Sequence, residues 1–180
     1  MYHITNDKRA FTSAGLILDA LKICLKEKNY DLITITDVCR VSTVSRATFY
    51  RLFDNMDDVL AWQIELYANE FEKEISGRNM DEIMILFFAN WMLHPQLLDI
   101  LIYIHREDIL FECHRKRADQ LSKYFLKVEH LSDYHLSVLT MILIGILTTW
   151  AKNGKKETPG ELVKTLQRVL RDCAAQMGNV

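Results

Sequence analysis

Apolar residues recur at intervals of three and four along most of the chain, and this spacing predicts helices. The first such stripe, which includes Ile17, Leu21 and Cys24, predicts a helix over residues 12–28. The sequence shows no strand-like alternation of any length, and only 2 Pro and 6 Gly interrupt it. We therefore expect an all-α fold of about nine helices.

Residues 34–53 predict two short helices joined by a tight turn. Thr34 precedes Asp37 by three residues, a spacing typical of a capping box at the start of a helix. Ser45 can cap a second helix, which Phe49 would anchor in the core. Two short helices joined in this way form a helix-turn-helix, a motif whose second helix can enter the major groove of DNA.

Further helices follow this motif. Asn55 can cap a long helix that continues to about Ile75, and Ser76-Gly77-Arg78-Asn79 is the first clear break after it. We place a domain transition in this region, with an N-terminal domain over residues 8–68 and a C-terminal helical domain over residues 69–180. Apolar spacing, together with Pro, Gly and Ser at the ends, predicts later helices over residues 80–93, 95–105, 106–129, 133–153 and 159–177.

Charge is unevenly distributed along the chain, although the formal net charge is only -2. Residues 1–53 carry eight Lys or Arg against five Asp or Glu, a net charge of +3. Residues 54–76 carry one Lys against seven acidic residues, a net charge of -6. A mildly basic head suits a DNA-binding end, although many solvated helices carry similar blocks.

The first turn of the second motif helix carries side chains suited to DNA. Arg46 is the one long donor there, and it can contact a guanine edge or a phosphate. Hydroxyl groups can bind phosphate oxygens, which position a helix without reading sequence. The alternative is a helical hairpin with ordinary exposed polar residues. The candidate DNA contacts are Thr34, Thr36, Ser45, Arg46, Ala47, Thr48, Tyr50 and Arg51.

The segment Val44-Ser45-Arg46-Ala47-Thr48-Phe49-Tyr50-Arg51-Leu52-Phe53 resembles the helix-turn-helix signature of the TetR family of transcriptional regulators. Asp57-Asp58-Val59-Leu60 matches the opening of that family's fourth helix. Residues 145–150 and 158–162 are similar to a subgroup linked to dihydroxyacetone kinase operons. The resemblance implies a three-helix DNA-binding domain followed by a helical domain that dimerises and binds an effector. It further implies a ligand-responsive repressor that binds a palindromic double-stranded DNA operator as a homodimer.

Two positions depart from the family pattern. Thr43 stands in the turn where the family usually has Gly, which adopts a positive φ angle at the lowest cost. Met56 stands where the family normally has a Lys that meets a phosphate, and one lost contact of this kind lowers DNA affinity modestly. Met56 and the low charge of the head keep an alternative function open: a TetR-like co-regulator that binds a ligand or a partner protein without direct DNA contact.

The resemblance assigns two further roles to the C-terminal domain. It places a pocket for an unknown small-molecule effector among the helices, although an aromatic residue at helical spacing more often belongs to a core. It also implies that the last two helices pack against their copies, and their surplus of apolar residues agrees with burial against a partner. The candidate pocket residues are Phe88, Trp91, Tyr103, Phe111 and Met141, and the candidate interface residues are Leu139, Ile142, Leu143, Ile146, Trp150, Leu162, Leu166 and Val169.

Other classes of function find no support in the sequence. His94, His105 and His114 lack the i, i+4 spacing of metal ligands, and we expect no metal. No phosphate-binding Gly loop or nucleophile motif occurs, so we expect neither an enzyme nor a cofactor. The longest apolar stretch, residues 141–147, is too short to cross a bilayer, and the first residues do not resemble a signal peptide. We therefore expect a cytoplasmic protein without a membrane partner.

Overall fold

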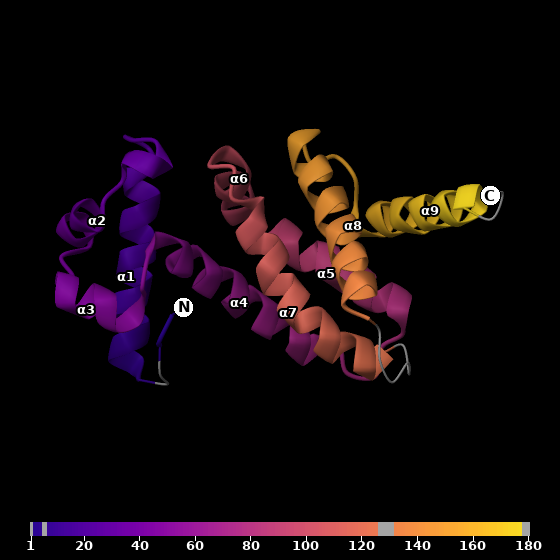
Figure 1. Cartoon of the computed structure of the whole chain (residues 1–180), viewed down its shortest axis with the longest axis horizontal. Helices are drawn as coiled ribbons and strands as arrows, with labels where there is room; N and C mark the ends of the chain where they lie inside the picture. Colours follow the sequence, from indigo (N-terminus) through magenta and orange to yellow (C-terminus); the bar gives the residue numbers. More distant parts are fainter. Residues whose placement is uncertain (1, 5–6, 126–131, 178–180) are drawn as a thin grey trace. The chain divides into compact units, whose positions relative to one another are not determined.

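The computed structural model describes residues 2–4, 7–125 and 132–177, and the regular elements within them are all helical (Figure 1). The predicted all-α fold is therefore confirmed, and the described ranges contain nine α-helices and one short 3-10 helix. The chain divides into two compact units, Met1–Leu66 and Tyr67–Val180. This division lies two residues before the boundary expected from the sequence.

Unit 1 is built around its first helix, α1, Lys8–Cys24. Ala14, Ile17 and Leu21 form its fully buried stripe, and both α2 and α3 pack against it. The helix begins and ends four residues earlier than the sequence predicted. It begins early because the Asp7 carboxylate accepts a hydrogen bond from the Arg9 N–H at 2.9 Å, a cap that the apolar pattern does not show. The other elements of this unit are η1 (Tyr30–Leu32), α2 (Ile35–Ser42), α3 (Arg46–Leu52) and the first part of α4 (Met56–Glu74).

Unit 2 contains the end of α4 and the five helices that follow. Asn79 and Glu82 form the capping box that starts the first of these, and Pro95 occupies the first turn of the next. The helix predicted over residues 106–129 is described as far as Phe125, so the end of that prediction lies outside the described residues. The five helices are α5 (Met80–Leu93), α6 (Pro95–Tyr103), α7 (Glu107–Phe125), α8 (Asp133–Lys152) and α9 (Pro159–Met177).

The helices of unit 2 enclose a second core. α5 packs against α9, and α7 runs beside α8 (Figure 1). Phe88, Trp91, Leu98 and Leu101 are almost fully buried among them. Helix α8 is 20 residues long and is the one described helix apolar enough, by length and composition, to cross a membrane. It buries one face in unit 2, as the core helix of a globular protein does.

Candidate nucleic-acid interface and ligand cavity

The first helix of the motif, α2, begins with a complete capping box. The Thr34 hydroxyl accepts the Asp37 N–H at 3.1 Å, and the Asp37 carboxylate accepts the Thr34 N–H at 3.1 Å. The same carboxylate accepts the Thr34 hydroxyl at 2.8 Å and lies 3.0 Å from the Lys28 ammonium. The hydrogen bond from Lys28, followed by those from Thr34, lowers the pKa of Asp37 far below its usual range. Asp37 is thus the capping residue that its position predicted.

The turn between the two helices centres on Thr43, which has φ 59° and ψ 12°. This left-handed conformation costs a residue with a Cβ atom about 1–2 kcal/mol, which explains why Gly is favoured at such a position. Buried Ser42 fixes the turn on both sides. Its hydroxyl donates to the Cys39 carbonyl at 3.4 Å and accepts the Val44 N–H at 3.2 Å. The turn therefore forms without Gly because a buried side chain holds the backbone around it.

The second helix, α3, is fixed at its start by Ser45. The Ser45 hydroxyl accepts the Thr48 N–H at 3.1 Å and donates to the Thr48 hydroxyl at 3.0 Å. Because the Thr48 oxygen accepts that bond, its own hydrogen remains available to an outside acceptor. Arg46 is exposed, and within the described ranges no hydrogen bond or ion pair involves its guanidinium group. The first turn of α3 thus carries one long cation and one hydroxyl donor free to meet DNA.

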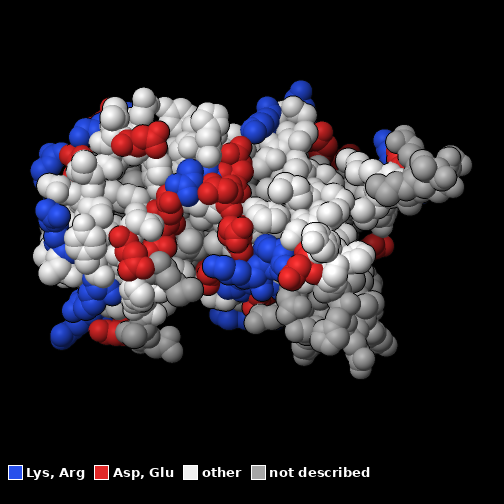
Figure 2. All heavy atoms as spheres, viewed as in Figure 1, with Lys and Arg blue, Asp and Glu red and all other residues white. Residues whose placement is uncertain are grey.

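The inner side of α3 is held by aromatic packing. Phe49 and Phe53 are fully buried with ring centroids 5.8 Å apart, and Phe53 packs edge-on against Trp62 at 6.0 Å. Tyr50 is 47% exposed on the outer side, where Arg51 is exposed as well. The edge of the molecule formed by α2 and α3 shows several Lys and Arg side chains (Figure 2). The fold therefore turns the apolar residues of α3 inward and its polar residues outward.

Seven of the eight candidate DNA contacts lie on exposed positions of α2, α3 and their caps, and Thr48 is half-buried. Two of them have a structural role as well, because the hydroxyls of Thr34 and Ser45 cap the two helices. Arg40 of α2 was missed. Its side chain is 71% exposed and lies 3.5 Å from Asp37, which leaves most of the guanidinium facing solvent. Only its charge signalled it in the sequence, because no motif distinguishes Arg40 from the other basic residues of the head.

Unit 2 contains a cavity of about 320 Å³, within the size range of small-molecule sites. Apolar side chains of α4, α5, α7, α8 and α9 form most of its wall, among them Phe71, Phe87, Leu143 and Leu166. The six polar or charged residues that line it are Glu72, Asp81, His114, Arg117, Thr140 and Gln167. Residues from five helices thus build one predominantly apolar chamber.

The polar groups of the cavity wall are largely paired with the protein. Arg117 donates to Glu72 at 2.5 Å and to the Asn69 side chain at 2.8 Å. Gln167 donates to Asp81 at 3.0 Å, and the buried Thr140 hydroxyl donates to a carbonyl of its own helix at 2.7 Å. The ion pair neutralises Arg117 and Glu72, whereas the exposed Asp81 keeps its charge because its partner is a neutral amide.

His114 contributes the remaining polar group of the wall. Its Nε2 accepts the Trp91 indole N–H at 3.2 Å, and Phe87 packs edge-on against its ring at 5.2 Å. Burial, with a smaller contribution from the Arg117 charge, lowers the pKa of His114 to about 4. The imidazole is therefore neutral at physiological pH.

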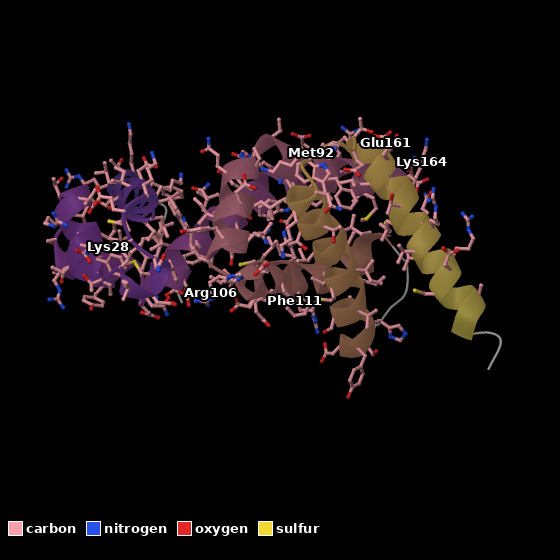
Figure 3. All side chains as sticks on the ribbon, turned by 90° about the horizontal axis from the view of Figure 1, so that it is seen from above. Lys28, Met92, Arg106, Phe111, Glu161 and Lys164 are labelled. Atoms are coloured by element: carbon pink, nitrogen blue, oxygen red, sulfur yellow. The ribbon has the colours of Figure 1, made fainter. Side chains whose placement is uncertain are left out.

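The five candidate pocket residues lie elsewhere. Phe88 and Trp91 are buried in the core of unit 2, whereas Tyr103 and Met141 are 63% and 55% exposed. Phe111 is half-buried on α7 (Figure 3). None of the five lines the cavity. The spacing of aromatic residues could not show which of them line a pocket and which belong to the core. The cavity wall is built mainly from aliphatic residues, and its one His belongs to no recognisable sequence motif.

The candidate interface residues divide into inward and outward groups. Trp150, Leu162 and Leu166 are buried within the protomer, and the Trp150 indole donates to the Glu157 carbonyl at 3.1 Å. Leu139, Leu143 and Leu166 line the cavity. Val169 is 37% exposed. Ile142 and Ile146 are half-buried on α8.

Helix α8 has one exposed apolar face and one buried apolar face. The sequence alone did not show which apolar residues of this helix belong to which face. Val138 is 57% and Met141 55% exposed, and both lie on this face with Gly145. A Cβ atom at Gly145 would meet nothing within 4 Å in the protomer. On α9, Glu161 and Lys164 are exposed polar residues near the start of the helix (Figure 3).

The helices described above are those of the TetR fold, with a helix-turn-helix in the first unit. A solved TetR transcriptional regulator from Streptococcus agalactiae 2603V superposes with a TM-score of 0.61 at 20% identity, covering 91% of this chain and 96% of that one. The chain thus has the TetR fold, in agreement with the resemblance found in the sequence.

Two further proteins are similar to this chain. Lin0861 from Listeria innocua has a TM-score of 0.83 at 19% identity, and the match covers 95% of this chain and 96% of that one. The HTH-type dhaKLM operon transcriptional activator DhaS of Lactococcus lactis is 26% identical over 146 residues, which are 74% of this chain and 72% of the relative. No protein-family profile matches the chain.

Proposed function

We propose that this protein is a DNA-binding transcriptional regulator of the TetR type. The observation that carries the proposal is the first turn of α3, where Arg46 extends from a helix that is capped at its start and anchored by buried aromatic residues. A long cation on a rigid helix suits a bidentate contact with a guanine edge. The relatives with a stated role are regulators of transcription, which also supports a non-enzymatic, cytoplasmic protein.

Selection from a pool of random DNA duplexes tests the proposal. We expect a near-palindromic site whose halves lie one helical turn apart, about 34 Å. Arg46→Ala should weaken binding to the selected site by about 1–3 kcal/mol and relax preference at one base pair. Lys26→Ala, which removes an exposed charge outside the motif, is the matched control and should leave the preference intact. If no duplex is selected above background at low salt, the proposal is wrong.

The protein should act as a homodimer whose contact includes the exposed face of α8. Val138 and Met141 leave apolar surface in water, and Gly145 allows the backbone of a second helix to approach closely. The candidate residues Ile142, Ile146 and Val169 would lie at this contact. Two copies joined by a twofold axis would present two α3 helices to a palindrome.

Sedimentation measures this association directly. Met141→Glu should convert the dimer to a monomer, because it places a charge in the proposed contact. Leu93→Glu is the control, since Leu93 is 76% exposed on another helix of the unit. A wild-type protein that sediments as a monomer, or a Met141→Glu variant that remains dimeric, would contradict the proposed interface.

The cavity of unit 2 is the proposed effector site, so we infer that a small molecule regulates DNA binding. The resemblance implies a repressor, whereas the Lactococcus lactis relative is named an activator. A reporter placed behind the selected duplex distinguishes the two signs of regulation. Expression that rises when the protein is removed indicates a repressor, and expression that falls indicates an activator.

Met56 favours a second candidate function, a co-regulator that binds a ligand or partner without contacting DNA. Met56 is half-buried at the first position of α4, where the resemblance expects a Lys that contacts a phosphate. Under this candidate, the duplex selection fails and a partner protein co-purifies with the chain. The two candidates therefore give opposite results in one experiment.

A further inference from the structure

Among the described residues, the cavity of unit 2 offers no unpaired charge that is shielded from water. Arg117 is already bound to both Glu72 and Asn69. Asp81 accepts only from the neutral Gln167 amide and keeps its charge, but it is exposed, so water screens that charge. An anionic ligand that took Arg117 would leave the Glu72 carboxylate without its partner, and an uncompensated charge in a partly desolvated site is costly. A cationic ligand that bound Glu72 would likewise leave the Arg117 charge without its partner. Both charged classes are therefore disfavoured by the wall.

The wall does offer one directed hydrogen bond. An indole N–H can only donate, so Nε2 of His114 must accept the bond from Trp91. In a neutral imidazole the proton then lies on Nδ1, which becomes a donor. Within the described ranges, no residue accepts a hydrogen bond from Nδ1. No fully buried side-chain nitrogen or oxygen in these ranges lacks a partner, so Nδ1 keeps accessible surface.

His114 is part of the cavity wall, which makes Nδ1 the candidate donor to a ligand. His114 lines the cavity, while Trp91 and Phe87 pack against its ring and hold its orientation. Most of the surrounding surface is apolar, so a hydrogen bond formed here is poorly screened by water. We propose that the cavity binds an uncharged, predominantly apolar small molecule with one hydrogen-bond acceptor, such as a carbonyl oxygen, directed at Nδ1 of His114. This inference rests on the proposed role of unit 2 as an effector-binding unit.

Three ligands of matched shape test the proposal: heptyl methyl ketone, the alkene in which a methylene group replaces the carbonyl oxygen, and octanoate. Each is titrated at neutral pH against the full-length protein without DNA, by displacement of a neutral naphthylamine dye. We expect the ketone to bind and octanoate to bind most weakly. Tighter binding of octanoate than of the ketone would overturn the proposal.

His114→Phe tests the directed hydrogen bond. The substitution should weaken binding of the ketone about fivefold relative to binding of the alkene, which is the change in affinity that one net hydrogen bond produces. The alkene also reports whether the variant still forms the cavity. An equal change for both ligands would show that Nδ1 makes no contact with the carbonyl oxygen.

A second pair of variants tests the location without altering a polar group. Ala118→Leu reduces the space in the cavity and should abolish binding of both ketone and alkene, whereas Ala89→Leu, on a half-buried residue outside the wall, should preserve it. Unchanged ketone affinity in Ala118→Leu would overturn the assignment. Because these titrations use no DNA, their failure leaves duplex selection, and with it the proposed DNA-binding function, unaffected.

Discussion

The two units present their candidate sites in opposite ways. In unit 1 the side chains proposed to function, such as Arg46 and Tyr50, are exposed, and the apolar residues between them turn inward. In unit 2 the proposed site is a largely apolar cavity between helices, in whose wall Arg117 is already paired with Glu72. A surface that binds a polyanion needs hydrogen-bond donors without a partner in the protein. A cavity for a small apolar molecule must contain few such donors, because the ligand cannot pair with them.

The two sites also differ in how they are assembled. The interface of unit 1 is set by local bonds, because Thr34 and Ser45 each cap a helix within three residues of themselves. The cavity of unit 2 requires contacts between distant segments, such as Glu72 with Arg117 and Asp81 with Gln167. A local motif retains its geometry as long as its anchors hold, and this can be tested directly.

Removing the anchor of α3 should have the largest effect. Phe49 is fully buried, and Phe49→Ala should destabilise unit 1 by about 3–5 kcal/mol because it leaves a cavity in a small core. Duplex binding should be lost, while dye binding by unit 2 should remain, as thermal unfolding and fluorescence would show. Tyr50→Ala is the control, since its 47% exposed ring should cost little stability. Loss of dye binding in Phe49→Ala would show that the two units do not fold independently.

Acid should weaken unit 2 through His114. Its pKa is about 4 in the folded chain against 6.5 for an unperturbed His, so between these values the unfolded state binds more protons. Stability is therefore greatest above pH 6.5 and falls as the pH drops towards about 4, by at most about 1.4 kcal/mol per pH unit. Urea titrations across this range measure the slope, and His114→Phe should flatten it. An unchanged slope in the variant would assign the effect to another group.

The same local character explains what the sequence could predict. Each cap of the motif lies within a few residues of the backbone N–H group that it binds, so Thr34, Asp37 and Ser45 could be assigned from spacing alone. The start of α9 at Pro159 was predicted from another local signal, a proline at the first helical position. The start of α5 at Met80 was predicted from the break at residues 76–79, and the Asn79–Glu82 capping box at that start was not identified. The predicted start of α1 was wrong, because Asp7 caps the helix ahead of the apolar stripe.

The cavity could not be predicted in this way. Apolar spacing shows that a residue faces inward, but not whether it meets another side chain or an empty space. Phe88 and Leu143 fit their helical stripes equally well, yet Phe88 belongs to the packed core and Leu143 lines the cavity. Likewise Met141 has the hydrophobicity of a core residue and is 55% exposed. Whether such a residue is packed in the core, lines the cavity or is exposed depends on how several helices are placed relative to one another within unit 2.

The turn of the motif should become more stable when its strained residue is replaced. Thr43→Gly should raise the stability of unit 1 by about 0.5–1 kcal/mol, because Gly adopts φ 59° without a Cβ penalty and loses only part of that gain to chain entropy. Thr36→Gly, in the right-handed backbone of α2, is the control and should lower stability by a few tenths of a kcal/mol. Differential scanning calorimetry measures both. If both substitutions changed the stability in the same direction, the turn would not be strained.

The smallest effect expected is a gain in DNA affinity from a single charge. Met56→Lys adds a cation at the first position of α4, where the resemblance expects a phosphate contact. If the protein already binds DNA through α3, the affinity should rise only a few-fold, and the logarithmic salt dependence should steepen by about 0.9 for each added contact. Measuring affinity for the selected duplex at several salt concentrations gives this slope.

Met80→Lys is the matched control, because Met80 is the first residue of α5 in unit 2 and should leave the salt dependence unchanged. Equal steepening in the two variants would indicate a nonspecific effect of net charge. A Met56→Lys variant that binds DNA strongly, set against a wild-type protein that binds none, would favour the co-regulator. In that case unit 1 has kept the capped and anchored motif but lost its contact with DNA, and ligand binding in unit 2 would be the activity that remains.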